Sequence, residues 1–542
     1  MRPRTLALIL SIVAIARMSV AQEHEHGGAA SEKIGTVVFA TSCAPAGQPH
    51  VNRAVALLHS FEFGRAVDAF SAALKADPSC AVAEWGIALS RWGNPFGVGI
   101  RPAGPLRLGR EAVERARTIG PKTDRERAYV EAVAHLYDKA DTIDQRTRLV
   151  AYREAMAALA AAYPRDTEAS IFHALAIAAV AAASPFDPTF AEPLKAGAIL
   201  EPLFATQPDH PGLAHYIIHS YDYPPLADRA LEAARRYAAI APDSPHARHM
   251  PSHTFTRVGY WQESIDANVA SGAVARREGA IGEELHTMDY RTYAYLQTAQ
   301  DAKARTMIEA LPEVTTRFDP NAPPAATPIS AAYFAMAAIP ARYALERGAW
   351  SDAAQLVPRA TAFPYTEALT YAARALGAAH TGNASLIKES IEALQRITDA
   401  LAAQHETYWA EQTDIQRREA TAWLAFIEGR HDDSIAAMRE AARIEDGTDK
   451  AAVTPGPLSP ARELLGELLL RQSQPAAALT EFEATLKKEP NRFRAVYGAA
   501  KSAALAGNRA KARAYYGQLV KICERADSPP RPELIEARAF LK

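Results

Sequence analysis

Prolines punctuate the chain at the spacing of helix pairs, and this period constrains the fold more than any other feature. They follow Asp, Gln, Ala or Glu at Pro78, Pro208, Pro242 and Pro490, and Pro208 and Pro242 lie 34 residues apart. A proline there ends one helix pair because its ring cannot continue the hydrogen-bond ladder, and the next helix can begin after it. A period of 34 predicts stacked helix pairs.

Between these prolines, apolar residues recur at spacings of three and four, as in residues 51–58, 66–74 and 461–470. This spacing predicts helices with one buried face. Residues 35–40 are the one short candidate strand. Hydrophobic residues make up 49% of the chain and charged residues 23%, which excludes a mostly disordered chain. The predicted fold class is therefore all-α.

Small, leucine and aromatic residues recur at the positions of a known repeat. They are Ala66, Phe70 and Ala73 before Pro78, Leu465, Gly466, Leu469, Ala478 and Phe482 before Pro490, and Ala512, Tyr516 and Leu519. In these positions the chain resembles the tetratricopeptide-repeat (TPR) superfamily. The resemblance implies a TPR-like α-solenoid, a right-handed superhelix of helix pairs whose concave groove binds a protein or peptide partner. Residues 246–253 and 445–463 also resemble secreted bacterial TPR proteins of undefined function, which implies no mechanism.

Two Pro-rich stretches divide the helical sequence. Residues 41–310 form the predicted N-terminal array, residues 311–328 a Pro-rich break, and residues 329–542 the C-terminal array. We interpret the break as a hinge between the arrays, and residues 447–460 as an ordered loop, since clustered prolines interrupt helices.

The first 21 residues have the features of a secretory signal peptide. Arg2 and Arg4 precede an apolar run, residues 6–16, and cleavage is expected after Ala21. The mature protein would then begin with a tail, residues 22–40, and be periplasmic or secreted. No later run of about 18 apolar residues follows, so we expect no transmembrane segment in the mature protein.

Charge and cysteine content exclude several functions. Without the first 21 residues, 57 basic and 62 acidic residues remain, a net charge of -5. This balance predicts no nucleic-acid partner. Three cysteines are too few for a disulfide scaffold or a cysteine-built zinc site. Cys43 and Cys80 either pair in an oxidising compartment or remain buried thiols, and the sequence leaves both open.

The positions of the histidines are the most informative functional feature. Six of sixteen lie within 44 residues, at His210, His215, His219, His246, His249 and His253. His215 and His219 form an i, i+4 pair on one helix face, and His249 and His253 form a second pair one 34-residue period later. First helices of successive repeats pack about 10 Å apart. The four imidazoles are therefore expected to face one shared space in the groove, close enough to bind one metal ion or two.

This register predicts a metal site. The predicted ligands are His215, His219, His249, His253, His246, His286 and Asp222, with Asp289 and Tyr293 on the same stripe as His286. Asp222 would ligate the ion or orient an imidazole. Imidazole and carboxylate without thiolate fit Cu²⁺ or Zn²⁺, and the sequence does not choose between them.

The same register is compatible with roles that need no metal. Duplication of one repeat would also produce two pairs, and the rings would then hydrogen-bond across the groove or bind a peptide or anion. Pro251 lies inside the second pair and can kink its helix.

Weaker candidates fit mainly structural roles. His24 and His26 lie in the tail, His59 is expected in the core or at a helix end, and Trp85, Trp261 and the Tyr408-Trp409 pair are expected in repeat packing. The acidic residues Glu445, Asp446 and Asp449 are typical of a helix terminus.

The sequence contains no HExxH, G-x-S-x-G, phosphate-binding glycine or C-x-x-C motif. We therefore predict a secreted or periplasmic TPR scaffold that binds a protein or peptide partner in its concave groove and carries a His-lined metal site. The alternative is a copper- or zinc-dependent enzyme built on the solenoid, in which Asp222 or Glu284 moves protons.

Overall fold

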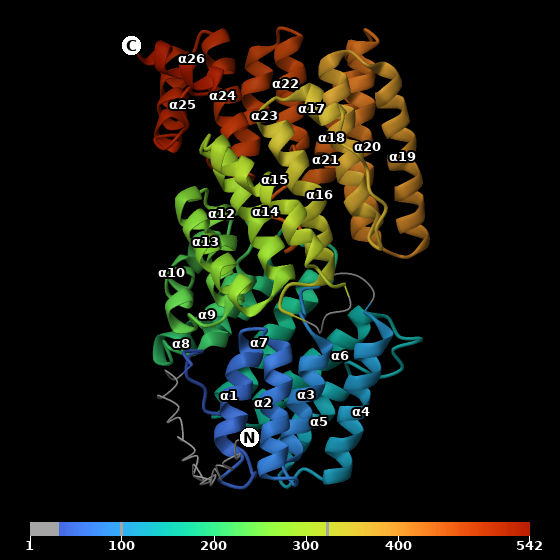
Figure 1. The fold of residues 1–542 in the computed structure, drawn as a ribbon, viewed down its shortest axis with the longest axis vertical. Coiled ribbons are helices and arrows are strands. Elements are labelled where there is room, and N and C mark those ends of the chain that lie inside the picture. The colour runs from blue at the N-terminus through green and yellow to red at the C-terminus, as the bar shows by residue number, and fades with distance from the viewer. Residues whose placement is uncertain (1–31, 98–100, 321–324) are drawn as a thin grey trace, which may run out of the picture.

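The computed structural model describes residues 32–97, 101–320 and 325–542, and the regular structure in these ranges is helical (Figure 1). The predicted signal peptide, its cleavage site, His24 and His26, and most of the predicted tail lie outside the described residues. The expected strand at residues 35–40 is wrong, because this segment is irregular. It packs onto the first helices instead, with Phe39 buried against Trp85.

The helices form consecutive antiparallel pairs. The first helices of the pairs are α1 (Gln48–His59), α3 (Ala81–Trp92), α5 (Asp124–Ala134), α7 (Thr167–Ala182), α9 (Pro211–Ser220), α11 (Pro245–His249) with α12 (Pro251–Arg257), α14 (Ile281–Gln297), α16 (Ile329–Glu346), α18 (Pro364–Thr381), α20 (Thr407–Ile427), α22 (Ala461–Arg471) and α24 (Phe493–Leu505). The second helices are α2 (Phe63–Ala76), α4 (Ala103–Ile119), α6 (Gln145–Ala162), α8 (Ala191–Thr206), α10 (Leu231–Ile240) after the short η1 (Ala227–Ala230), α13 (Trp261–Glu278), α15 (Asp301–Thr316), α17 (Trp350–Ala354), α19 (Ala384–Ala403), α21 (His431–Asp446), α23 (Pro475–Lys488) and α25 (Arg509–Ile522), and α26 (Pro532–Leu541) follows.

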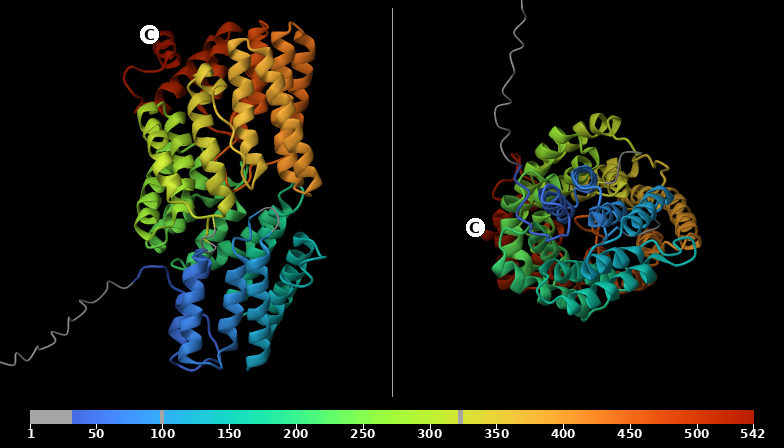
Figure 2. Two further views of the ribbon diagram at one scale, coloured as in Figure 1. Left: turned by 45° about the vertical axis from the view of Figure 1, so that its right-hand side comes forward. Right: turned by 90° about the horizontal axis from the view of Figure 1, so that it is seen from below.

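Each helix packs against the next, and the pairs wind into a superhelix. In the view from below in Figure 2, the chain turns clockwise as it recedes from the viewer, which makes the superhelix right-handed. Successive turns touch where the α12–α13 corner meets the α23–α24 corner: the Trp261 indole donates to the Asn491 carbonyl at 2.9 Å. The all-α, TPR-like solenoid predicted from the sequence is confirmed.

Small residues allow the close packing that the repeat pattern predicts. A Cβ on Gly86 would lie 2.1 Å from the Phe70 ring, and a Cβ on Gly498 would lie 2.4 Å from the Phe482 ring. Each aromatic ring therefore fills the space that a glycine leaves on the following helix, and a larger residue there would force the two helices apart.

Two large apolar clusters follow the chain order. One runs from Ile34 to Phe255 and also includes Ala326, from the predicted break. The other runs from Ala299 to Ala537, with smaller clusters around α13 to α16 between them. Helix α15 continues past Pro312 to Thr316, so the helical part of the chain extends into the predicted break. The array boundaries stay a prediction.

Residues 447–460 are an ordered segment on the inner side of the superhelix. The Arg342 guanidinium of α16 donates to the Gly456 and Pro457 carbonyls, and the Tyr290 hydroxyl of α14 donates to the Thr454 carbonyl at 3.2 Å. Most of the segment is buried. The chain itself thus fills part of the concave space that the repeat resemblance assigns to a partner.

Within the described ranges, none of the helices combines the length and apolar composition that crossing a bilayer requires.

A disulfide joins Cys43 and Cys80, so the structure decides between the two alternatives that the sequence left open. It ties the segment before α1 to the start of α3, and Cys523 remains a buried free thiol.

Replacing both Cys43 and Cys80 with serine should lower the free energy of unfolding by about 3 to 4 kcal/mol, because the bond closes a loop of 37 residues in the unfolded chain. Urea unfolding with and without dithiothreitol measures this. The reductant should lower the midpoint of the wild type and leave the double variant unchanged; equal sensitivity of the two proteins would contradict the bond.

Candidate metal centre

Three consecutive first helices bring six of the predicted histidines together. Helix α9 carries His215 and His219, α11 and α12 carry His246, His249 and His253, and α14 carries His286. All six imidazoles are buried, with at most 7% of any residue exposed. The prediction that the two i, i+4 pairs face a common interior therefore matches the placement of these side chains.

The six rings form two groups of three rather than one group of four. One ring nitrogen each of His215, His219 and His246 lie within 4.8 Å of one another, and the same holds for His249, His253 and His286. We name these groups site A and site B. Each i, i+4 pair is completed by a histidine from the next first helix, because neighbouring inner helices pack directly side by side. The sites adjoin, with ring centres of His219 and His253 6.1 Å apart.

Pro251 interrupts the helix without separating the second pair. It divides α11 from α12, but Met250 between them keeps right-handed helical torsions, φ -52° and ψ -35°. His249 and His253 therefore stay on one face, and their Nε2 atoms lie 3.1 Å apart. The proline that the sequence places inside this pair does not disturb its spacing.

Hydrogen bonds at Nδ1 determine the tautomers in site B. His249 Nδ1 donates to Asn268 Oδ1 at 2.7 Å, and Asn268 Nδ2 donates to the Ser264 carbonyl, so the amide orientation is defined. His253 Nδ1 donates to the Asp222 carboxylate at 3.0 Å. Both acceptors lack a proton to give, so in neutral rings the proton sits on Nδ1 and each Nε2 carries a lone pair.

Two lone pairs facing each other at 3.1 Å repel unless something positive lies between them. Two imidazole nitrogens bound about 2.0–2.1 Å from one tetrahedral ion would lie about 3.3 Å apart. Nδ1–H groups that donate to a carboxylate or an amide oxygen are the usual support of metal-binding histidines. His249 and His253 of site B could therefore hold a metal ion between their Nε2 atoms.

Site A repeats the pattern with a different acceptor. His215 Nδ1 donates to the His59 carbonyl at 2.6 Å, which leaves its Nε2 as the lone pair. The Nε2 atoms of His215, His219 and His246 have no hydrogen-bond partner among the described residues. His246 Nδ1 lies 3.6 Å from Glu283 Oε1, which places a carboxylate beside this ring. Buried nitrogens without partners are costly, and an ion would satisfy them.

A third buried cluster, His59, Glu168 and His210, shows the opposite arrangement. Both Nε2 atoms donate to the Glu168 carboxylate, at 2.8 and 2.9 Å, and the Tyr216 hydroxyl donates to His59 Nδ1. Burial alone would raise the pKa of Glu168, but the two imidazoles lower it to about 2. His59 uses both of its ring nitrogens in this cluster, whereas His210 Nδ1 has no hydrogen-bond partner among the described residues. The cluster supports site A through the His59 carbonyl. The expectation that His59 belongs to the core is confirmed.

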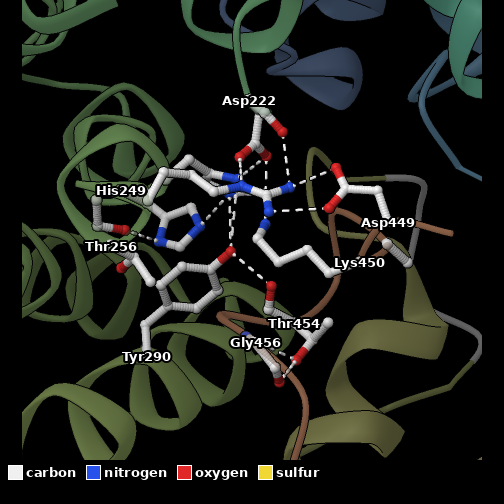
Figure 3. Close-up of polar contacts among 12 residues, drawn as sticks. Asp222, His249, Thr256, Tyr290, Asp449, Lys450, Thr454 and Gly456 are labelled. Atoms are coloured by element: carbon white, nitrogen blue, oxygen red, sulfur yellow. Dashed lines mark hydrogen bonds and ion pairs between the residues drawn. The ribbon is translucent and has the colours of Figure 1, made fainter. Parts of the chain in front are cut away.

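Asp222 orients an imidazole, one of the two roles that the sequence allowed. Its carboxylate accepts from His253, from Arg257 Nε at 2.8 Å and from Lys450 Nζ at 3.4 Å. Figure 3 shows Asp222, Asp449 and Lys450 converging beside His249 and Tyr290. Burial would raise the pKa of Asp222, but Lys450, Arg257 and His253 hold it well below its usual value.

Burial lowers the pKa of five of the six histidines and keeps these five neutral. It lowers the pKa of His215, His219 and His249 well below 6.5, with neighbouring imidazoles adding to the effect. It lowers the pKa of His286 to about 3, and it outweighs Asp222 at His253. Neutral imidazole is the form that can bind a metal ion, so these rings are in the protonation state that metal binding would require.

Several residues at the centre were not identified from the sequence. Tyr290 lies on α14 with its hydroxyl 3.4 Å from both ring nitrogens of His253, and Asn268 and Glu283 support the rings. A signal was present for Asn268, which shares a buried polar stripe of α13 with Ser264 and Ser271. Tyr290 and Glu283 had no comparable signal.

Three polar residues that the sequence linked to the site are engaged away from the histidines. Glu284 is held by Arg276 and Arg317, so it is not placed to move protons at the histidines. Asp289 pairs with Arg342, and the Tyr293 hydroxyl accepts from Arg492.

The aromatic and acidic candidates have mainly structural roles. Trp85 and Trp261 pack between helices, as expected. Trp409 stacks on Tyr365 with ring centres 3.8 Å apart. At the end of α21, Glu445 accepts from the Ala461 amide and Asp446 pairs with Arg462.

Comparison with known proteins adds little to this description. No protein-family model and no characterised protein matches the chain in sequence. Among solved structures, the APC/C hetero-tetramer Cut9-Hcn1 is 12% identical with a TM-score of 0.35, over 93% of this chain and 78% of that one. Naa15/Naa10 bound to HypK is 12% identical with a TM-score of 0.24, over 92% and 73%. Such distant likenesses identify no function, and the fold class rests on the helix pairing itself.

The ion-free protein should lose stability as the pH falls below about 6.5. Unfolded histidines take up protons there, whereas five buried rings have a lowered pKa and resist protonation until a lower pH, so each of the five contributes a loss of up to about 1.4 kcal/mol per pH unit. The five are His215, His219, His249, His253 and His286. Thermal unfolding in chelator between pH 7.5 and 5 measures the slope. Replacing His249 and His253 with glutamine should make it shallower; an unchanged slope would show that these rings are protonated in the fold.

Proposed function

We propose that the protein binds two copper or zinc ions, one at site A and one at site B, and that this centre is its principal function. One observation carries the proposal: His215 in site A and His249 and His253 in site B are buried and held by Nδ1 hydrogen bonds, which leave their Nε2 lone pairs facing the neighbouring rings. A duplicated structural histidine would be expected to use both nitrogens as His59 does, with Tyr216 and with Glu168.

Three nitrogen donors at each site suit either metal. Zn²⁺ and Cu²⁺ both bind imidazole well, and a three-histidine set leaves at least one position open. Open sites are typical of metal ions that act on a small molecule, whereas structural zinc sites usually have four protein ligands. This favours the enzyme alternative over a storage site.

A separate observation supports the proposed localisation. A disulfide between Cys43 and Cys80 fits an oxidising compartment, which supports export to the periplasm or exterior by the predicted signal peptide. Partner binding in the concave groove stays a prediction. Residues 447–460 already occupy part of the inner side, so a protein or peptide partner would have to bind around them.

Metal content tests the proposal. Protein stripped with chelator, incubated with Zn²⁺ or Cu²⁺ and dialysed should hold two ions per chain by mass spectrometry of the element. His215→Ala and His249→Ala should each lose one ion. His135→Ala is the matched control, because His135 is an exposed histidine paired only with Asp138, and it should retain both. Fewer than one ion in the wild type, or full retention in both site variants, would contradict the proposal.

Asn268→Leu tests the support of site B without touching a ligand. The His249 Nδ1–H would lose its acceptor, so the affinity of site B should fall by about 10- to 100-fold. Competition with a metal indicator measures the affinity, and site A serves as the internal control. Equal affinity of the variant and the wild type at site B would refute the tautomer argument.

A further inference from the structure

A cavity of about 210 Å³ ends at the metal centre. Its inner end is formed by His219, Ser220, Asp222 and Lys450, and its walls include Phe96, Phe186, Phe190, Tyr223 and Tyr408. Exposed residues of the α7–α8 connection, such as Asp187, form its mouth. Of the three site A histidines, His219 is the one that lines the cavity. The cavity therefore connects the outside with site A at His219.

The inner end carries polar groups without partners. Ser220 Oγ is buried and has no hydrogen-bond partner among the described residues, and Ser220 is only 1% exposed. Lys450 Nζ has three donors and reaches one acceptor, Asp222 Oδ2, at the long distance of 3.4 Å. Unpaired buried donors cost free energy, so this end is completed by a ligand that accepts hydrogen bonds.

Charge at the inner end favours an anion once ions are bound. Arg257 and Lys450 balance Asp222 and Asp449, to which Arg257 donates at 2.8 Å. The histidines of site A add no charge of their own as neutral ligands. The Glu283 carboxylate beside His246 offsets one of the two positive charges of a divalent ion there. One positive charge therefore remains, and a buried uncompensated charge attracts a counter-charge strongly.

The walls favour an aromatic ring. Phe96 stacks on the His219 imidazole with ring centres 3.9 Å apart, and Phe190 contacts Tyr223 at 5.3 Å. Ala178, Ala181 and Ala182 of α7 form the facing wall, and their small side chains leave room for a planar group. Aromatic rings prefer such stacked or edge-to-face neighbours.

We propose that this cavity binds a small aromatic carboxylate, with the ring between the aromatic wall and α7 and the carboxylate directed at Lys450, Ser220 and the open position of site A. The inference rests on the proposed metal centre and names the class of molecule on which it acts. Acidic residues at the mouth of the cavity do not prevent a carboxylate from binding. Asp187 is exposed, so solvent screens its charge, and its carboxylate already accepts a hydrogen bond from Thr189.

Benzoate is the probe, and its neutral isostere benzamide and the ringless acetate are the comparisons. Titration calorimetry of the protein loaded with two ions should show that benzoate binds at least 10-fold more tightly than either. Ala181→Phe should fill the cavity and weaken benzoate binding at least 10-fold while both ions are retained. Ala162→Phe, at the exposed end of α6, is the matched control and should bind normally.

Lys450→Met should also weaken benzoate more than benzamide, because it removes the cation and retains the aliphatic stem. Metal content is measured on every sample. A wild type without ions overturns the metal centre, and this inference with it. A wild type with two ions that ignores benzoate, binds benzamide equally well, or is unaffected by Ala181→Phe overturns the cavity assignment alone.

Discussion

Hydrogen bonds from imidazole Nδ1 atoms to fixed acceptors are the interaction on which the centre depends. The His59 carbonyl, the Asn268 amide and the Asp222 carboxylate each accept from one ring, and each thereby turns an Nε2 lone pair toward its neighbours. None of these acceptors can reverse its role, because a carbonyl and a carboxylate have no proton and the Asn268 NH₂ group is already used. The solenoid contributes the burial that keeps the rings neutral.

Much of the candidate site could be predicted from the sequence, because residues one repeat period apart in the chain lie on neighbouring helices in the fold. The 34-residue offset placed His249 and His253 against His215 and His219, and the helices do bring both pairs to one interior. The division into two sites was not accessible, because it depends on which neighbouring helix supplies the third ring. The strand expected at residues 35–40 failed because apolar residues there cover the first helices rather than pair with another strand.

Residues 447–460 show that local sequence patterns do not predict long-range contacts. Its prolines predicted an ordered loop, but no sequence feature indicated that Lys450 would reach Asp222 across more than two hundred residues, or that the Thr454 carbonyl would accept from Tyr290. These contacts arise because the superhelix returns the C-terminal half to the inner side of the N-terminal half. Residues 447–460 therefore contribute to the candidate metal centre, to the cavity beside it and to the inner side of the superhelix.

Anomalous diffraction from crystals of the zinc- or copper-loaded protein, collected at the absorption edge of the metal, tests the central claim most directly. The account predicts two peaks in the interior, one between the Nε2 atoms of His249 and His253 and one beside those of His215 and His219, each about 2.0–2.1 Å from its nitrogens. Peaks confined to surface residues, or a peak within the His59–Glu168–His210 cluster and none at the other two, would contradict it.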